Sequence, residues 1–328
     1  MWNSIKAMSA ILLRLVVEGN MKSVFKHILT GLVVAGTAVG LVPLRAADKS
    51  ARLSFVAVGT NEFGFDTGVL KGKVRSQGKS AGLSSVVYLP TGLRLDSSLG
   101  LFSHYRVFTT NHRFGTAAWD WPSEASVESD GSLLVLWPST ADRPFELAAK
   151  YSWASPGSLD LETSVRALGA LDKFEVFLAS YFTDSFTNAL VCAGPKHEWI
   201  ATTVDKGLWQ TYLGRDDALP IFRDGRWKLE PYPVDWTCAG KLQAHVAVRR
   251  APAANLTVGL MARPADCFAI SLPHQSEAHF STYLSLFGRD LKAGESASAR
   301  TRLVVIPTAD EGSLLKSYEG FLKETAPK

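Results

Sequence analysis

The sequence predicts an all-β protein, a large antiparallel β-sandwich of the supersandwich type that is closed by one C-terminal helix. Short β-branched and aromatic runs alternate with turn residues through most of residues 48–328. Helical segments do not alternate with these runs, as they would in a parallel α/β sheet. No repeat of fixed period is visible, which argues against a propeller or a solenoid.

The expected strands follow the apolar runs and are, in order, Leu53–Val58, Ser84–Leu89, Ser103–Thr109, Leu133–Trp137, Phe145–Trp153, Leu159–Ala167, Phe174–Phe182, Leu242–Arg249, Leu256–Met261, Cys267–Leu272, Thr282–Phe287 and Ala299–Ile306. Turn signals between them are Ser129-Asp130-Gly131, Ser155-Pro156-Gly157, Asp224-Gly225 and Lys292-Ala293-Gly294. The long region Thr183–Asp235 is expected to carry irregular loops.

One amphipathic helix is expected at the C-terminus, beginning near Asp310. Its apolar side chains recur at helical spacing and form one stripe, made of Leu314, Leu315, Tyr318, Phe321 and Leu322. The helix should therefore lie with this stripe against a sheet.

Residues 1–47 have the layout of a secretory signal peptide. A basic start after Met21, the apolar run Ile28–Val42 and small residues at Ala46 and Ala47 carry this interpretation, and Met21 is a candidate for the real start. An uncleaved N-terminal anchor is the alternative. We expect a secreted or periplasmic protein whose remaining chain, Asp48–Lys328, folds as one domain.

Removing this leader makes the chain formally neutral. The whole chain has 35 basic and 31 acidic groups, of which residues 1–47 hold five and one, so 30 of each remain. A nucleic-acid partner would need a basic stripe, and none stands out. No second segment is long and apolar enough to cross a membrane. We expect no cofactor.

Cys192, Cys238 and Cys267 make an odd count, so one thiol at least has no partner within the chain. One disulfide among the three is an alternative to three small buried thiols, which we favour. Their spacing is not that of metal ligands.

The segment Leu101–Pro122 (LFSHYRVFTTNHRFGTAAWDWP) holds the densest group of chemically capable side chains. Strand alternation places His104 and Arg106 on one face, which suits either a buried ion pair or a platform for a sugar. His112 and Arg113 are expected in the adjoining turn.

The same segment ends in Trp119-Asp120-Trp121. Indole rings stack on the C–H faces of sugars, and Asp120 between them could orient a neighbouring cation. Trp next to charged residues recurs later in the chain. The further candidates for ligand contact are Arg226, Trp227, Asp235 and Trp236.

Two segments resemble the galactose-mutarotase-like β-supersandwich. Leu159–Val165 (LDLETSV) is similar to a mid-chain strand of that fold, and Phe287–Glu295 (FGRDLKAGE), followed by a strand, resembles its ending. The chain is also similar to secreted bacterial proteins of uncharacterised role. The resemblance implies a concave sheet face that binds a sugar, with a late carboxylate as general base and a His as general acid.

In this sequence Glu277 best matches that carboxylate, and His104 is the candidate acid, with His112 as its alternative. His274 and His279 flank Glu277 and are candidates for substrate contact. The family's spaced His pair is not found. An exposed hairpin loop, or a metal site of these His with Glu277, are the other interpretations of this segment.

The predicted function is carbohydrate recognition, either by a mutarotase- or aldose-1-epimerase-like isomerase or by a lectin-like module without catalysis. A structural envelope protein is a third class. Glycoside hydrolysis is a lower alternative, in which Glu175 and Asp184 would act as paired carboxylates. No metal is part of the predicted site.

Overall fold

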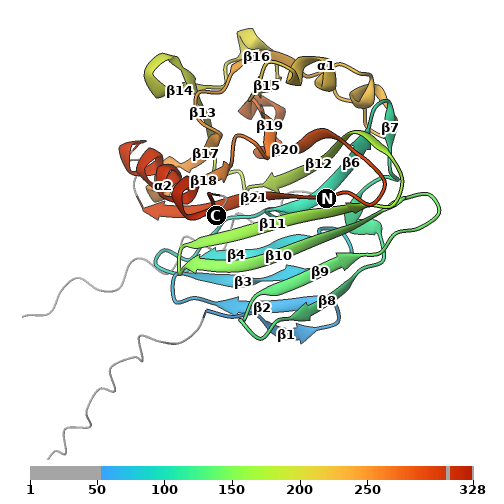
Figure 1. Cartoon of the computed structure of the whole chain (residues 1–328). Coiled ribbons are helices and arrows are strands. Elements are labelled where there is room, and N and C mark those ends of the chain that lie inside the picture. Colours follow the sequence, from blue (N-terminus) through green and yellow to red (C-terminus); the bar gives the residue numbers. More distant parts are fainter. Residues whose placement is uncertain (1–52, 308–310, 327–328) are drawn as a thin grey trace, which may run out of the picture. The chain divides into compact units, whose positions relative to one another are not determined.

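The structure is a computed structural model that describes residues 53–307 and 311–326. The expected leader, residues 1–47 with the alternative start at Met21, lies outside the described residues. The described residues belong to one compact unit. Its strands form sheets of five, nine and seven strands (Figure 1).

The five-stranded sheet is an antiparallel meander in which neighbours along the chain are neighbours in the sheet. Its strands are β1 (Val56–Gly59), β2 (Glu62–Asp66), β3 (Leu70–Arg75), β4 (Gly82–Tyr88) and β5 (Leu93–Arg94).

The nine-stranded sheet combines early and late parts of the chain. Its order is β14 (Glu198–Ala201), β13 (Asn188–Gly194), β17 (Val246–Ala251), β18 (Leu256–Ala262), β21 (Ser296–Pro307), β11 (Ser158–Ala167), β10 (Phe145–Ser155), β9 (Leu133–Trp137) and β8 (Glu124–Val127). Its neighbouring strands are all antiparallel.

The seven-stranded sheet is the one that positions the candidate site. Its order is β16 (Thr237–Lys241), β15 (Trp209–Leu213), β19 (Cys267–Pro273), β20 (Ser281–Leu291), β12 (Leu171–Tyr181), β6 (Ser103–Thr109) and β7 (His112–Arg113). Only β15 and β16 pair in parallel within it.

The main hydrophobic core is shared by all three sheets. Trp137 of β9, Leu178 of β12 and Val74 of β3 are buried in this one cluster. A second cluster covers the other face of the seven-stranded sheet, where Phe177 and Tyr283 meet the short helix α1 (Ala218–Phe222). The seven-stranded sheet therefore buries both of its faces.

The predicted all-β sandwich is confirmed, and each expected strand overlaps an observed one. The bounds of β6 and β9 are those expected. The expectation of irregular loops across Thr183–Asp235 is wrong in part, because β13, β14, β15 and α1 lie there. Polar residues and glycines stand within and between these elements, which makes the region look like loops in sequence.

The expected C-terminal helix is present as α2 (Glu311–Glu324). Leu314, Tyr318 and Phe321 of the predicted stripe are buried against Val248 and Met261 of the nine-stranded sheet. Figure 1 shows α2 beside β17, β18 and β21.

The three cysteines are free thiols, with Cys192 and Cys267 buried and Cys238 partly buried. Burial raises the pKa of Cys267 to about 12, which makes its thiol inert at neutral pH. Within the described ranges, no helix combines the length and apolar character that crossing a membrane requires.

Candidate functional site

A β-bulge in β6 separates two residues that strand alternation placed together. Phe177 and Leu178 are consecutive in β12, yet they pair with Arg106 and His104, which leaves Tyr105 as an extra residue. The bulge turns His104 into the main core and Arg106 onto the opposite face of the sheet. The prediction that the two share a face is wrong.

His104 has a structural environment. Its Nε2 lies 3.0 Å from the Thr163 hydroxyl on β11, and its ring centroid lies 4.9 Å from that of Trp137. Burial lowers the pKa of His104 to about 4, so its imidazole is neutral at pH 7. Because His104 is fully buried, the predicted role as general acid toward a ligand is not compatible with its position.

A cavity of about 290 Å³ lies on the face of the seven-stranded sheet that carries Arg106. Strands β6, β12, β15 and β20 and residues 227–236 contribute most of the wall, and Leu99 and His279 complete it. Eight aromatic rings line it, those of Tyr105, Phe177, Tyr181, Trp209, Trp227, Tyr232, Trp236 and Tyr283. We call this space the aromatic cavity.

The rings of the aromatic cavity support one another. Tyr283 stacks on Phe177 at a centroid distance of 4.6 Å. Trp236 meets Tyr283 edge-on at 5.8 Å and Trp209 edge-on at 5.3 Å. Such mutual packing restricts side-chain rotation, so the cavity is formed before any ligand arrives.

Hydrogen-bond donors inside this wall lack acceptors. Arg106 is 4% exposed, and its Nη2 donates to the Tyr232 carbonyl at 2.8 Å. Its Nε and Nη1, and the indole nitrogens of Trp227 and Trp236, are buried without a partner among the described residues. Unbonded buried donors also occur away from the cavity, as at Trp137 and Trp199, but four of them belong to residues that line this one cavity. Because such donors cost free energy, the wall is suited to a ligand rich in acceptor oxygens.

Beside the cavity, the structure brings His279 and Glu277 together. The His279 ring lines the cavity, with its centroid 5.0 Å from the Trp209 ring. Glu277 Oε1 lies 3.6 Å from His279 Nδ1, but Glu277 itself is not a lining residue. The predicted base thus stands behind His279 rather than in the cavity.

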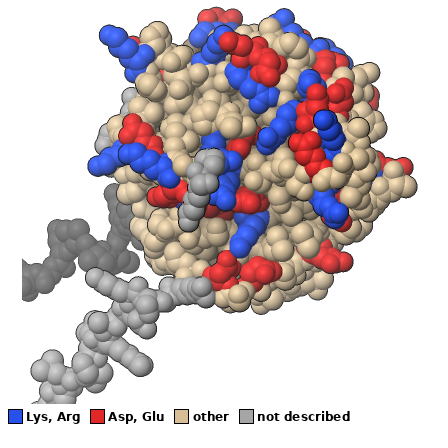
Figure 2. All heavy atoms as spheres, viewed as in Figure 1, with Lys and Arg blue, Asp and Glu red and all other residues tan. Residues whose placement is uncertain are grey.

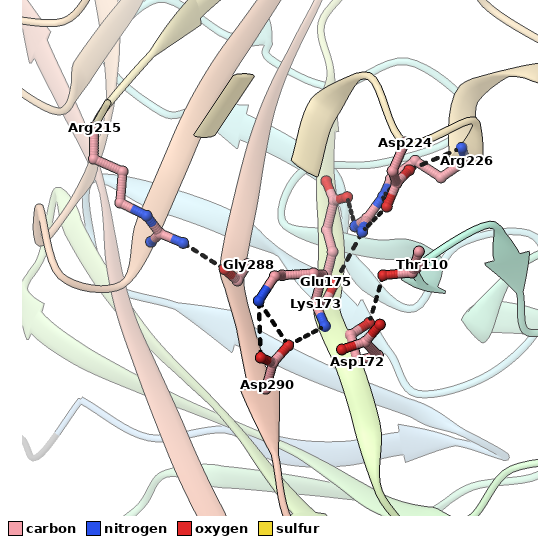
Figure 3. A network of polar contacts seen from close by, with 9 residues as sticks. All are labelled: Thr110, Asp172, Lys173, Glu175, Arg215, Asp224, Arg226, Gly288 and Asp290. Carbon is pink, nitrogen blue, oxygen red and sulfur yellow. Dashed lines mark hydrogen bonds and ion pairs between the residues drawn. The ribbon is translucent and has the colours of Figure 1, made fainter. Parts of the chain in front are cut away.

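Arg226 belongs to a buried ion-pair network rather than to a ligand surface (Figure 3). Its Nη1 donates to Glu175 Oε2 at 2.7 Å, and both side chains are fully buried. Its other nitrogens donate to Asp224 and to the Lys173 carbonyl. The turn before it forms at Gly225, whose φ of +102° suits glycine. The prediction of Arg226 as a ligand contact is corrected accordingly.

The Trp119-Asp120-Trp121 group does not form a sandwich around a ligand. The Trp119 ring stacks on Tyr105 at 4.4 Å and so supports the cavity wall from behind. Trp121 is buried beneath the Arg143 guanidinium, which lies 4.1 Å from the ring centroid. Asp120 is exposed.

Two further candidates lie outside the aromatic cavity. Asp235 has a side chain that is 92% exposed and pairs with Lys228 at 2.8 Å. His274 caps a short 3-10 helix, Gln275–Glu277, and lines a separate hollow of about 230 Å³ beside Asn188.

The two carboxylates that the hydrolase alternative requires, Glu175 and Asp184, do not lie near each other. Glu175 is buried in its ion pair with Arg226, whereas Asp184 is exposed beyond the other end of β12. Nine residues of extended chain span roughly 30 Å, well above the separation of about 5–10 Å that glycosidases use.

Four predicted residues therefore meet at the aromatic cavity: Arg106, Trp227, Trp236 and His279. The sequence reasoning missed Tyr105, Tyr181 and Tyr283, which line it from strands. A tyrosine within a strand is common in a core as well as in a cavity wall, so these residues gave no signal that separates the two. A larger hollow of about 440 Å³ on β8–β11 holds none of the predicted site residues.

The described residues show neither a group of metal ligands nor, on the face drawn in Figure 2, a surface patch of one charge that would extend this site. Across residues 53–307 and 311–326, no group of three or more His, Cys, Asp or Glu side chains is placed to hold a metal ion. Figure 2 shows Lys and Arg interspersed with Asp and Glu over the face that it presents.

Fold and site together define an antiparallel β-sandwich protein with a preformed aromatic cavity on one sheet. Comparison with protein-family models finds no match, and neither does comparison with curated protein sequences. Solved structures do match. The chain is similar to the Slr1438 protein from Synechocystis sp. PCC 6803, with 11% identity, a TM-score of 0.50, and coverage of 77% of this chain and 99% of that one.

Similar structures also include proteins of the class that the sequence resembles. One is a galactose mutarotase-like protein from Lactobacillus casei, with 11% identity, a TM-score of 0.45, and coverage of 77% of this chain and 100% of that one. Another is a GalM/aldose epimerase homologue from C. elegans, with 9% identity, a TM-score of 0.43, and coverage of 73% and 96%. At these identities the likeness concerns the fold alone.

Proposed function

We propose that the protein binds a carbohydrate in the aromatic cavity and does so outside the cytoplasm, in the secreted or periplasmic setting that its leader predicts. The observation that carries the proposal is the pairing of aromatic walls with unsatisfied donors. Trp209, Trp236 and Tyr283 offer ring surfaces for the C–H faces of a sugar. Arg106 and the Trp227 indole offer donors for its oxygens.

Binding without catalysis is favoured over epimerisation or hydrolysis. No Asp or Glu is among the described residues that line the cavity. Aldose epimerisation needs a base for the anomeric hydroxyl proton, and hydrolysis needs two carboxylates. The size also favours a small ligand, because about 290 Å³ is at the lower end of ligand pockets, which span roughly 300–1,000 Å³.

Tryptophan fluorescence against a panel of mono- and disaccharides tests this proposal. Binding should change the emission of the wild type, because Trp209, Trp227 and Trp236 line the cavity. Trp236→Ala should weaken binding by about tenfold or more, as one stacking ring is lost. Trp199→Phe is the matched control, since Trp199 packs near α2 instead. A panel without any response would favour a structural envelope protein.

A mutarotase-like activity is the second candidate, and the pair of His279 and Glu277 supports it. His279 touches the cavity, and Glu277 could accept a proton from it. Polarimetry on freshly dissolved aldoses measures the rate of mutarotation and so tests this second candidate. Rates that are lowered by both Glu277→Gln and His279→Gln would establish catalysis, whereas no rate above the spontaneous one would leave binding alone.

A further inference from the structure

The charge balance of the aromatic cavity says more about its ligand than the rings do. Arg106 is the permanent cation that lines it, and no carboxylate among the described residues lies within ion-pair distance of its guanidinium. The other partners of Arg106 are the Tyr232 carbonyl, the Tyr105 hydroxyl at 3.3 Å, and the ring faces of Tyr105 and Trp227 at 4.9 and 5.5 Å. All of these are neutral.

Arg249 is fully buried and likewise bonds only carbonyl and hydroxyl oxygens, but it is not among the residues that line the cavity. Two other buried arginines do have carboxylate partners. Arg226 meets Glu175 and Asp224, and Arg302 meets Asp160 at 2.6 Å. A buried guanidinium without an opposite charge is costly, and partial compensation by carbonyls and rings leaves two nitrogens of Arg106 unbonded. Neutralisation of Arg106 is thus left to whatever fills the cavity.

Neighbouring groups strengthen the positive potential. Arg113 lies beside the same wall, with its guanidinium 5.9 Å from the Tyr105 ring centroid. Burial and the charge of Arg106 lower the pKa of Arg113 to about 10, which indicates that no nearby anion offsets the two. Arg113 donates to the carbonyls of Pro231 and Thr116 and is not a lining residue, so it contributes charge without competing for the ligand.

We propose that the ligand of the aromatic cavity is a monosaccharide acid and that the Arg106 guanidinium binds its carboxylate. This inference rests on the proposed carbohydrate binding and narrows its ligand class. A guanidinium binds carboxylate through short, charge-assisted hydrogen bonds, and one lining cation balances one negative charge. A phosphate monoester, which carries close to two charges at neutral pH, would be only half neutralised.

Calorimetric titration of the wild type with glucuronate, galacturonate, glucose, galactose and glucose 6-phosphate tests the inference. The hexuronates should bind at least tenfold more tightly than the corresponding hexoses. Arg106→Gln should lose about ten- to a hundredfold in hexuronate affinity and little in hexose affinity. Arg166→Gln is the charge-matched control, because Arg166 is exposed on β11 in another sheet, and it should bind like the wild type.

The outcomes separate this inference from the proposed function. Equal affinity for hexoses and hexuronates would overturn the assignment of the carboxylate and leave carbohydrate binding standing. Preference for glucose 6-phosphate would overturn it in favour of a dianion. Binding of none of the probes would overturn both. If Arg106→Gln does not fold, two other measurements replace it. Arg106→Lys should bind hexuronates more weakly than the wild type, and raised salt should lower the hexuronate affinity of the wild type.

Discussion

The neutral imidazole of His104 makes the stability of this protein depend on pH. Burial holds its folded-state pKa near 4, against 6.5 for the free side chain. Between these values the unfolded chain binds a proton that the folded chain does not, so the free energy of unfolding falls as pH drops from about 6.5 to about 4. The full loss for this one group is about 3 kcal/mol.

Urea unfolding from pH 7 to pH 4.5 measures the effect, and His104→Gln should flatten the dependence. A slope remains in that variant, because burial also lowers the pKa of His245 to about 4. Identical slopes in the variant and the wild type would show that His104 does not titrate differently on unfolding.

The ion pair of Glu175 and Arg226 predicts a second residue-scale effect. Glu175→Gln should lower the free energy of unfolding by about 3–5 kcal/mol, because it leaves a fully buried guanidinium with only Asp224 as counter-charge. Asp235→Asn breaks an exposed pair with Lys228 and should leave the free energy of unfolding nearly unchanged. Denaturant unfolding compares the two, and similar costs would contradict a structural role for the buried network.

At the scale of the element, β6 shows where sequence reasoning succeeds and where it stops. Its bounds, Ser103–Thr109, follow from composition and alternation. The bulge at Tyr105 does not, because it depends on the register with β12, to which β6 is brought only by folding. One extra residue placed His104 and Arg106 on opposite faces of the sheet, so only Arg106 kept its expected place in the site.

The helix α2 was predictable because its apolar period is long and uninterrupted. Phe321→Ala should lower the free energy of unfolding by about 3–5 kcal/mol, as Phe321 is fully buried against the nine-stranded sheet. Lys323→Ala changes an exposed side chain of the same helix and should alter it by less than about 0.5 kcal/mol. Thermal unfolding distinguishes them; equal melting temperatures would mean that α2 does not contribute to the cooperative unit.

For the whole molecule, the sandwich followed from patterns within the chain, whereas the site depended on three-dimensional charge pairing. Arg106 and Arg226 look alike in sequence, each near an aromatic residue and within reach of charges. Folding gives Arg226 two carboxylates and Arg106 none. The contrast between a structural arginine and the one proposed to bind a ligand is therefore a property of tertiary contacts, which no local sequence pattern reports.

The shared core also makes a prediction about how ligand binding reaches the rest of the protein. The aromatic cavity rests on Phe177 and Tyr283, and the adjacent residues Leu178 and Leu284 of the same strands lie in the core that all three sheets build. A sugar at a hundred times its dissociation constant should add about 2.7 kcal/mol to the free energy of unfolding. Because the sheets share one core, this gain should raise a single thermal transition by roughly 5–10 °C.

Calorimetric scans with the tightest-binding sugar of the panel check this, with Trp236→Ala as the variant that should lose the shift. If two transitions appear and ligand raises the temperature of only one of them, the cavity wall of residues 227–236 unfolds separately from the sandwich. The wall formed by residues 227–236 makes this a real alternative, since Lys228 and Asp235 on it are exposed and joined by a solvent-screened pair. A single shifted transition instead means that ordering the cavity and closing the core are one event.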